Sequence, residues 1–532
     1  MKPQKITTGP LTVKSALIIV GLALTAGLAF DRLVRYDPPG LGFVMFSTLV
    51  IVSATIVRRP GRWETYLLLA GSWTLALWVM IRAADYLAAI NICAGLLLLS
   101  AAVTSEVFAP RVWLLRVRDL PVAGLGQLRS VCVGAFAPLA AVARERTNIR
   151  IGPALPYLRG FLFAAPVFVV FAALLASADS VFSNFLGDVI PSFDISIGET
   201  GAHVIWTAVV AWLTAGFLVF IAQPEPQPQV RPGDLQAAGD IAGDRPYEAP
   251  AFDRPIKRVE RGPAGDRYVE SMTVLGSITA LFALFVGFQF AYLFSGAAQV
   301  DLPGVTYAQY ARAGFFQLLA VATLTSGLVW VAFQISGARL EGRRLTAFRA
   351  VSALMILLTG VILASALKRL GLYEQAYGFT RLRLLSHVFS LLVGGVLLLL
   401  AAQLFWRERQ LFLAGTVALG FTALTALNAI NPDAYIAARN LDRRQPRKAP
   451  SLGYISELSA DAVPAVIARY RNGPPNVRYA DQIDAWACET LTPDRGWRGW
   501  NLGAARAQSA RDRSGLNRAS PRRKNWMQFC VT

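Results

Sequence analysis

Apolar runs long enough to cross a lipid bilayer recur along most of the chain. A spanning helix needs roughly 20 predominantly apolar residues. Runs of this kind cover residues 16–30, 41–57, 65–82, 86–104, 159–177, 203–222, 272–295, 313–336, 348–367, 384–405 and 410–428. Only 16% of the residues are charged, whereas a soluble domain carries about a quarter. The pattern predicts an all-α polytopic bundle of transmembrane helices with eleven spans.

A further apolar run, at 131–143, is short and flanked by arginines on both sides. Apolar segments of this length are more often interfacial or re-entrant than spanning. We therefore expect about 11–12 spans and favour eleven.

Changes in composition divide the chain into four parts. A Pro/Gln-rich stretch followed by a basic one forms a linker between two transmembrane halves, and we expect this linker to be flexible. After the last span the chain becomes polar and rich in arginine. The four parts are 1–222, the linker 223–268, 269–430, and the polar C-terminal region 431–532.

Short helices are expected within the polar C-terminal region, so that it forms a small helical, Arg-rich region. Ser459 is expected to cap the first of them, with Asp461 in its first turn, where an acidic side chain suits the helix dipole. Trp497, Trp500 and Trp526 supply apolar material. The expected helices cover 459–471, 480–491 and 501–513.

The net charge of +19 comes mainly from arginines in loops and tails. Basic loops orient membrane helices toward the cytoplasm and contact anionic headgroups. The loop 58–62 and the connection 105–158 are rich in arginine, whereas 178–202 holds no lysine or arginine. This places the N-terminus inside and, with eleven spans, the C-terminal region outside. The basic residues that closely follow the last span favour the inside instead, but long terminal regions can cross regardless of charge, and we favour the outside. The lipid bilayer is the expected partner, and no nucleic acid is expected.

Cysteine and histidine usage predicts neither a metal site nor a cofactor. Cys488 and Cys530 form a disulfide if their region faces an oxidising compartment, whereas Cys93 and Cys132 lie in apolar runs and are expected to be inert. The chain has two histidines and no HExxH motif. Nucleotide-binding loops of the GxxxxGK[ST] and GxGxxG types and a GxSxG hydrolase elbow are also absent from the sequence.

A dense polar cassette, "GLYEQAYGFTRLR" at 371–383, separates two of the apolar runs. Ionisable groups at membrane depth are costly, so each is a functional candidate. One interpretation is a binding site for a small anionic solute or lipid headgroup, with arginine forks and tyrosine hydroxyls as donors. The other is an interfacial hairpin with aromatic anchors. The candidate ligand-binding residues here are Tyr373, Glu374, Tyr377, Thr380, Arg381 and Arg383.

A second cassette, "TYAQYARAGFF" at 306–316, has similar chemistry and the same predicted outer side. Its Tyr307, Tyr310 and Arg312 complete the candidate site if the two cassettes converge, and form an aromatic belt if they do not. Two other polar features have structural interpretations. Arg82 and Asp85 are expected to form an ion pair, and "NAINPDAY" at 428–435 is expected to cap and turn the chain.

Several blocks resemble bacterial membrane proteins of the domain of unknown function 4173. They are "YAQYARAGFFQLL", "LYEQAYGFTRLRLL", "LNAINPDAYIAARNLDR", "LSADAVPAV" and "WRGWNLGAARA", and together they cover roughly 155–507. The resemblance implies a multi-pass protein of the bacterial inner (cytoplasmic) membrane and brings no established activity. It also implies that the first cassette is a family feature.

Three functions from different classes fit these observations. The first is a non-enzymatic transporter or a regulatory membrane protein that binds lipid or an anion. The second is a membrane-embedded transferase for a lipid-linked substrate, with Glu374 or Asp433 as the base. The third is a structural scaffold. Mid-span charges are sparse, which counts against an ion-coupled pump, and we favour the non-enzymatic interpretation with no residue assigned a catalytic role.

Overall fold

The computed structural model describes a set of helices with gaps between them. The described residues are 12–107, 124, 127–128, 130–132, 134–138, 199–222, 264–294, 307–337, 340–406, 412–442, 452–472, 486–487, 490–491 and 496–514. Every regular element within these residues is a helix. The prediction of an all-α polytopic protein is confirmed.

Two compact units make up the chain. The first comprises Met1–Pro38, Met45–Thr65 and Pro121–Pro226, and the second comprises Pro39–Val44, Tyr66–Leu120 and Gln227–Thr532. In the first unit, α1 (Val13–Leu33) packs on α9 (Glu199–Ala222), and most of α2 (Leu41–Val57) belongs here as well. A side chain at Gly27 would collide with the carbonyl oxygen of Thr207. Glycine therefore lets α1 and α9 approach closely.

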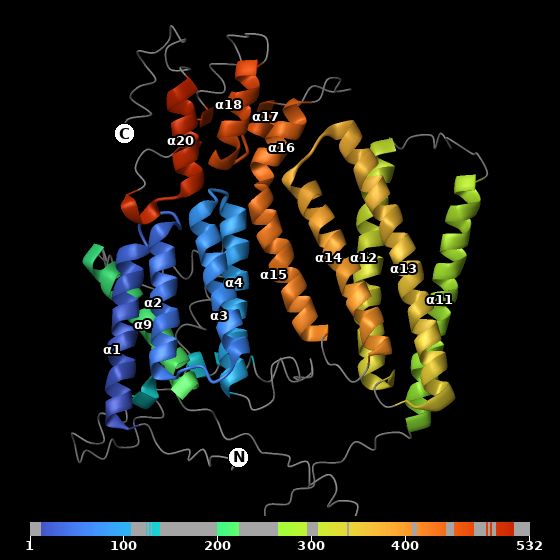
Figure 1. Ribbon diagram of the computed structural model, residues 1–532, viewed down its shortest axis with the longest axis horizontal. Helices are drawn as coiled ribbons and strands as arrows, with labels where there is room; N and C mark the ends of the chain where they lie inside the picture. Colours follow the sequence, from blue (N-terminus) through green and yellow to red (C-terminus); the bar gives the residue numbers. More distant parts are fainter. Residues whose placement is uncertain are drawn as a thin grey trace, which may run out of the picture. The chain divides into compact units, whose positions relative to one another are not determined.

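The second unit contains two groups of long apolar helices (Figure 1). Helices α11 to α14 enclose an apolar core that includes Phe315, Phe348 and Met355. The other group packs through Leu87 and Leu427, with Gly71 against Phe421. The helices are α3 (Trp63–Ile81), α4 (Asp85–Val107), α11 (Ala264–Phe294), α12 (Tyr307–Ile335), α13 (Gly342–Tyr377), α14 (Arg381–Phe405) and α15 (Phe412–Ile430).

The C-terminal region of the second unit forms a small helical assembly at the end of the bundle where α15 ends (Figure 1). Its own core contains Ile436, Val463, Val466 and Ala507, all buried. The elements are α16 (Pro432–Leu441), α17 (Leu452–Ile455), the 3₁₀ turns η3 (Ala460–Ala462) and η4 (Trp497–Gly499), α18 (Val463–Asn472) and α20 (Leu502–Ser514).

The predicted spans agree well with the helices. Nine helices among the described residues are long and apolar enough to cross a membrane, and the shorter α2 covers a tenth predicted span. The span at 159–177 lies outside the described residues, as do most of 131–143 and the linker up to 263. The helices expected at 459–471 and 501–513 match η3 with α18 and α20, whereas most of 480–491 is not described.

Candidate functional site

The polar cassette forms a tight elbow between α13 and α14. Helix α13 continues to Tyr377 and ends at Gly378, whose φ of 82° is readily adopted only by glycine. Thr380 then caps α14, since its hydroxyl accepts a hydrogen bond from the Arg383 amide at 3.4 Å. Because the helix stops before Arg381, this arginine does not share the face of Tyr373 and Tyr377.

Arg381 makes a two-pronged ion pair with Asp433 at the start of α16. Its Nε lies 2.9 Å from Asp433 Oδ1 and its Nη2 lies 2.6 Å from Oδ2. The Asp433 side chain is only 1% exposed, whereas that of Arg381 is 30% exposed. A planar guanidinium matched to a carboxylate in this way gives a strong, directional pair. It joins the elbow to the C-terminal region.

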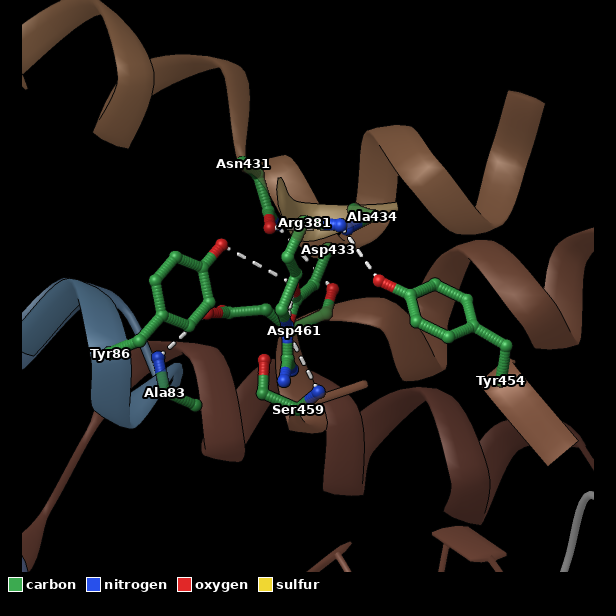
Figure 2. A network of polar contacts seen from close by, with 9 residues as sticks. All are labelled: Ala83, Tyr86, Arg381, Asn431, Asp433, Ala434, Tyr454, Ser459 and Asp461. Atoms are coloured by element: carbon green, nitrogen blue, oxygen red, sulfur yellow. Dashed lines mark hydrogen bonds and ion pairs between the residues drawn. The ribbon is translucent and has the colours of Figure 1, made fainter. Parts of the chain in front are cut away.

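Asp433 also collects donors from two other segments (Figure 2). The Ser459 amide donates to its Oδ2 at 2.8 Å, and the Tyr86 hydroxyl of α4 lies 3.4 Å from its Oδ1. The Arg381 guanidinium lies over the Tyr86 ring, 5.0 Å from its centroid, and the Arg381 amide donates to the Tyr454 hydroxyl at 2.7 Å. One buried carboxylate thus connects four segments that are distant in sequence.

These contacts keep Asp433 ionised. Burial by itself raises the pKa of a carboxyl, but the hydrogen bonds from Arg381 and Ser459 outweigh burial and hold the pKa of Asp433 below its usual range. A carboxylate with a lowered pKa that is already saturated with donors is a poor general base.

Asn440 makes a second connection between the elbow and α16. Its Oδ1 accepts from the Phe379 amide at 2.7 Å, and its Nδ2 donates to the Phe379 carbonyl at 2.9 Å. The side-chain amide thus satisfies both backbone polar groups of a residue that belongs to neither helix. Asn440 is buried.

The start of α16 confirms the cap-and-turn interpretation of "NAINPDAY". Asn431 has a left-handed backbone, with φ of 56°, and its side chain accepts from the Ala434 amide at 3.3 Å. Pro432 occupies the first turn of α16, where its missing N–H costs nothing. Asn428 faces the bundle instead and exchanges two hydrogen bonds of 2.9 Å with Asn91.

Asp461 connects the C-terminal region to the turn between α3 and α4. Its Oδ2 accepts from the Ala83 amide at 2.7 Å, so it caps the start of α4 from a distant segment. Its Oδ1 is buried without a hydrogen-bond partner and occupies the space that a side chain at position 503 would need, where the chain has Gly503. Burial raises the pKa of Asp461 to about 6, against the opposing effect of the Ala83 amide.

Two local predictions are wrong. Arg82 does not pair with Asp85: its Nε donates to the Asn428 carbonyl at 2.6 Å and its Nη2 to the Ala429 carbonyl at 3.2 Å, so it caps the end of α15. The Ser459 hydroxyl makes no capping bond and has no hydrogen-bond partner, because the residue contributes its amide to Asp433 instead.

The other candidate residues of the first cassette have different surroundings. Glu374 is buried and its Oε2 lies 2.8 Å from His387 Nε2. Arg383 stacks over the Tyr373 ring, 4.1 Å from its centroid, and donates to the Gly378 carbonyl. The Tyr373 and Tyr377 rings are 5.1 Å apart, and Tyr377 is 47% exposed.

The second cassette starts α12, at the end of the second unit where α13 ends (Figure 1). The side chains of Tyr307, Tyr310 and Arg312 lie outside the described residues, as do Cys488 and Cys530. Cys93 and Cys132 are free and exposed. Among the described side chains, no group of three or more His, Cys, Asp or Glu residues is arranged to hold a metal ion.

Sequence reasoning missed Tyr86, Tyr454 and Asn440 as parts of this site. Tyr86 directly follows a residue that we had singled out, and Asn440 lies in the same sequence block as Asp433. For these two residues the only signal was proximity to a residue of interest, which does not show that two blocks meet in the fold, and Tyr454 had no signal in the sequence.

The helices and the polar elbows at their ends define an integral, multi-pass membrane protein. The family model of a domain of unknown function, DUF4153, matches residues 69–468, well over half of the chain. The chain therefore belongs to this family. The match includes the elbow, Tyr86, Asp433 and Asp461, and it does not confirm the narrower family expected from the sequence blocks. Comparisons with curated proteins and with solved structures give no match.

Proposed function

We propose that this protein is a non-enzymatic regulatory protein of the bacterial inner membrane. In this proposal an anionic lipid headgroup or small anionic solute binds at the elbow and changes how firmly the C-terminal region is held. The observation that carries the proposal is the convergence of donors from the elbow, from α4 and from Ser459 on the single carboxylate of Asp433. A ligand that shifts the elbow therefore also shifts Arg381, the side chain that pairs with Asp433 of the C-terminal region.

The ligand is expected at Arg383 rather than at Arg381. The charge of Arg381 is compensated by Asp433, whereas Arg383 donates to a neutral carbonyl and retains its positive charge for an anion. The neighbouring rings of Tyr373 and Tyr377 place two hydroxyl groups on the same face of α13. A cation with tyrosine hydroxyls suits a phosphate oxygen.

The other functions receive less support from the described residues. Asp433 is held ionised and saturated with donors, which argues against its role as the base of a transferase. The buried charged side chains of the described membrane helices, Asp31, Glu64 and Glu374, all lie near helix ends. An ion-coupled pump is expected to place such groups through the depth of the bundle. The narrower assignment to the domain of unknown function 4173 also remains our proposal, supported by the five sequence blocks quoted above.

The test uses the full chain in lipid nanodiscs with nitroxide labels at Gln375 and Glu457. We expect phosphatidylglycerol, but not phosphatidylcholine, to change the distance distribution between the two labels. Arg383→Gln should abolish this response, whereas Arg343→Gln, at the opposite end of α13, should retain it. An unchanged response in Arg383→Gln refutes the site. No response in the wild type refutes the regulatory proposal and favours the scaffold.

A further inference from the structure

Two tryptophans of the C-terminal region lie on its surface, although this region is mostly polar. Trp497 begins η4 and is 60% exposed, and Trp500 directly follows η4 and is 42% exposed. Among the described side chains beyond Ile430, these two are the only large hydrophobic ones that are exposed. Trp486 of the same region, in contrast, is buried in its core. Two exposed indoles within one turn therefore point to an interaction surface.

The backbone around η4 is hydrogen-bonded to the ends of two apolar helices. The Leu41 amide, at the start of α2, donates to the Trp500 carbonyl at 3.0 Å. The next residue, Asn501, donates through its side chain to the carbonyls of Val79 and Arg82, at the end of α3. All of these groups belong to the second unit. They fix the position of η4 relative to both helix ends.

Glycines allow these contacts to be close. A Cβ atom at Gly40 would lie 2.5 Å from the Trp500 carbonyl oxygen, and one at Gly503 would lie 3.1 Å from the Ala83 amide nitrogen. Both distances are too short for an ordinary side chain. The backbone of η4 and the start of α20 therefore lie directly on the helix ends.

The ends of apolar membrane helices mark the depth of the bilayer surface. The apolar sequence of α2 begins at Leu41, and that of α3 ends at Ile81. A 3₁₀ helix rises about 2 Å per residue, so Trp497 lies within about 6 Å of Trp500 along the turn. The interfacial layer on each side of the hydrocarbon core is itself about 5–7 Å thick. This puts η4 at the depth of the lipid headgroups.

We infer that η4 is a membrane anchor, in which Trp497 and Trp500 enter the headgroup layer of the bilayer beside the ends of α2 and α3. Indole is favoured at this depth, because its ring is apolar whereas its N–H donates a hydrogen bond. Neither indole N–H has a hydrogen-bond partner among the described residues. Phosphate and ester oxygens of the lipids supply the acceptors.

The anchor does not depend on the proposed anion site. It uses neither Arg383 nor the elbow, and it holds for either side of the membrane. Helix α20 leads from η4 away from the ends of the membrane helices (Figure 1). The exposed Gln508, on α20, therefore belongs to the same region but lies beyond the headgroup layer.

The test measures collision rates of nitroxide labels on the full chain, with the native cysteines replaced and one chain per phosphatidylcholine nanodisc. One label replaces Trp497, and another replaces the exposed Gly496, which leaves both tryptophans intact. The control label is at Gln508. Oxygen concentrates in lipid, whereas a nickel chelate stays in water. We expect the ratio of oxygen to nickel collisions to be several-fold higher at positions 496 and 497 than at Gln508.

Two results would overturn the inference. Ratios at positions 496 and 497 equal to that at Gln508 would place η4 in water. Low collision rates with both reagents would show that protein, and not lipid, covers the tryptophans. The Gly496 label gives either result without the loss of a tryptophan. The anion site can fail its own test without affecting this one, because phosphatidylcholine is the lipid to which that site is not expected to respond.

Discussion

At the scale of single residues, the pair of Arg381 and Asp433 should stabilise the fold only as a pair. Breaking a buried ion pair leaves an uncompensated charge, which costs about 3–5 kcal/mol. We expect Arg381→Met and Asp433→Leu each to lower thermal stability strongly, and the double variant to recover most of the loss. The exposed pair of Arg469 and Asp442, 2.8 Å apart, is the control, since solvent screens such pairs and they contribute little to stability. A double variant no more stable than the single variants would contradict this view.

Asp461 predicts an unusual pH dependence. Its folded pKa, raised to about 6, lies above the unfolded value of about 3.9. Its contribution to stability is therefore fully present below about pH 4 and is lost as the pH rises through about 6. Acidification from pH 7 to 5 should stabilise the wild type by about 1 kcal/mol more than Asp461→Asn. Thermal unfolding of both proteins at the two pH values measures this difference. Equal responses would show that Asp461 is not the titrating group.

The sequence identified many of the polar residues of the site but not their partners. Arg381 and Asp433 were both singled out, because ionisable residues near membrane helices are rare. Their contact joins the elbow to a helix beyond the last span, and no local pattern reports such a distance. For Arg82 the error was to predict a nearby partner instead of a distant one. Sequence proximity predicts Asp85 as its partner, whereas the guanidinium donates to the carbonyls at the end of α15.

At the scale of elements, Gly378 controls where α13 ends. With φ of 82°, Gly378→Ala should strain the elbow and destabilise the protein by about 1–2 kcal/mol. Gly371, earlier in the same helix, has open space around it, so Gly371→Ala should be neutral or stabilise by up to about 1 kcal/mol. Chemical or thermal unfolding of the two variants makes the comparison. A loss at Gly371 that equals the loss at Gly378 would refute the argument from backbone conformation.

The helices and their caps were predicted well where the local sequence alone determines them. The long helices follow from apolar length, since a bilayer forces every backbone polar group to be satisfied within the helix. The cap at Asn431 follows from an Asn-Pro pair at a helix boundary. The predicted cap at Ser459 was wrong because a contact with another element, and not the capping preference of serine, determines which group of this residue is used. Its amide is used by Asp433, a residue of another element.

At the scale of the whole molecule, the contacts predict which segments share a membrane face. Gln375 and Glu457 lie at the junction of the elbow with the C-terminal region, so cysteines placed there in a background without native cysteines should react alike. The loop charges predict that both face outside. A membrane-impermeant thiol reagent on intact cells should label both, and it should not label a cysteine at Arg59, because α3 carries the chain across the membrane. Labelling of only one of the first two would contradict the described junction.

The positions of the described spans were predictable because hydropathy reports directly on the bilayer, but the attachment of the C-terminal region was not. Its helices are short and polar, and the side chains that hold it to the bundle are single residues: Asp433, Asn440, Asp461 and Asn501. Asn501 donates to the carbonyls of Val79 and Arg82 at 3.0 and 2.7 Å. Asp433 and Asp461 were identified from the sequence, but nothing in the sequence around any of the four indicates a contact with the bundle.

The position of these four residues in the chain also determines when the bundle can be completed during synthesis. All of them follow α15, so the ribosome synthesises them after every described membrane helix. Until then the Phe379 amide and carbonyl, the Ala83 amide and the Arg381 guanidinium lack the partners that they have in the finished protein. A chain that stops short of Asn431 therefore leaves both the elbow and the turn between α3 and α4 without these hydrogen-bond partners.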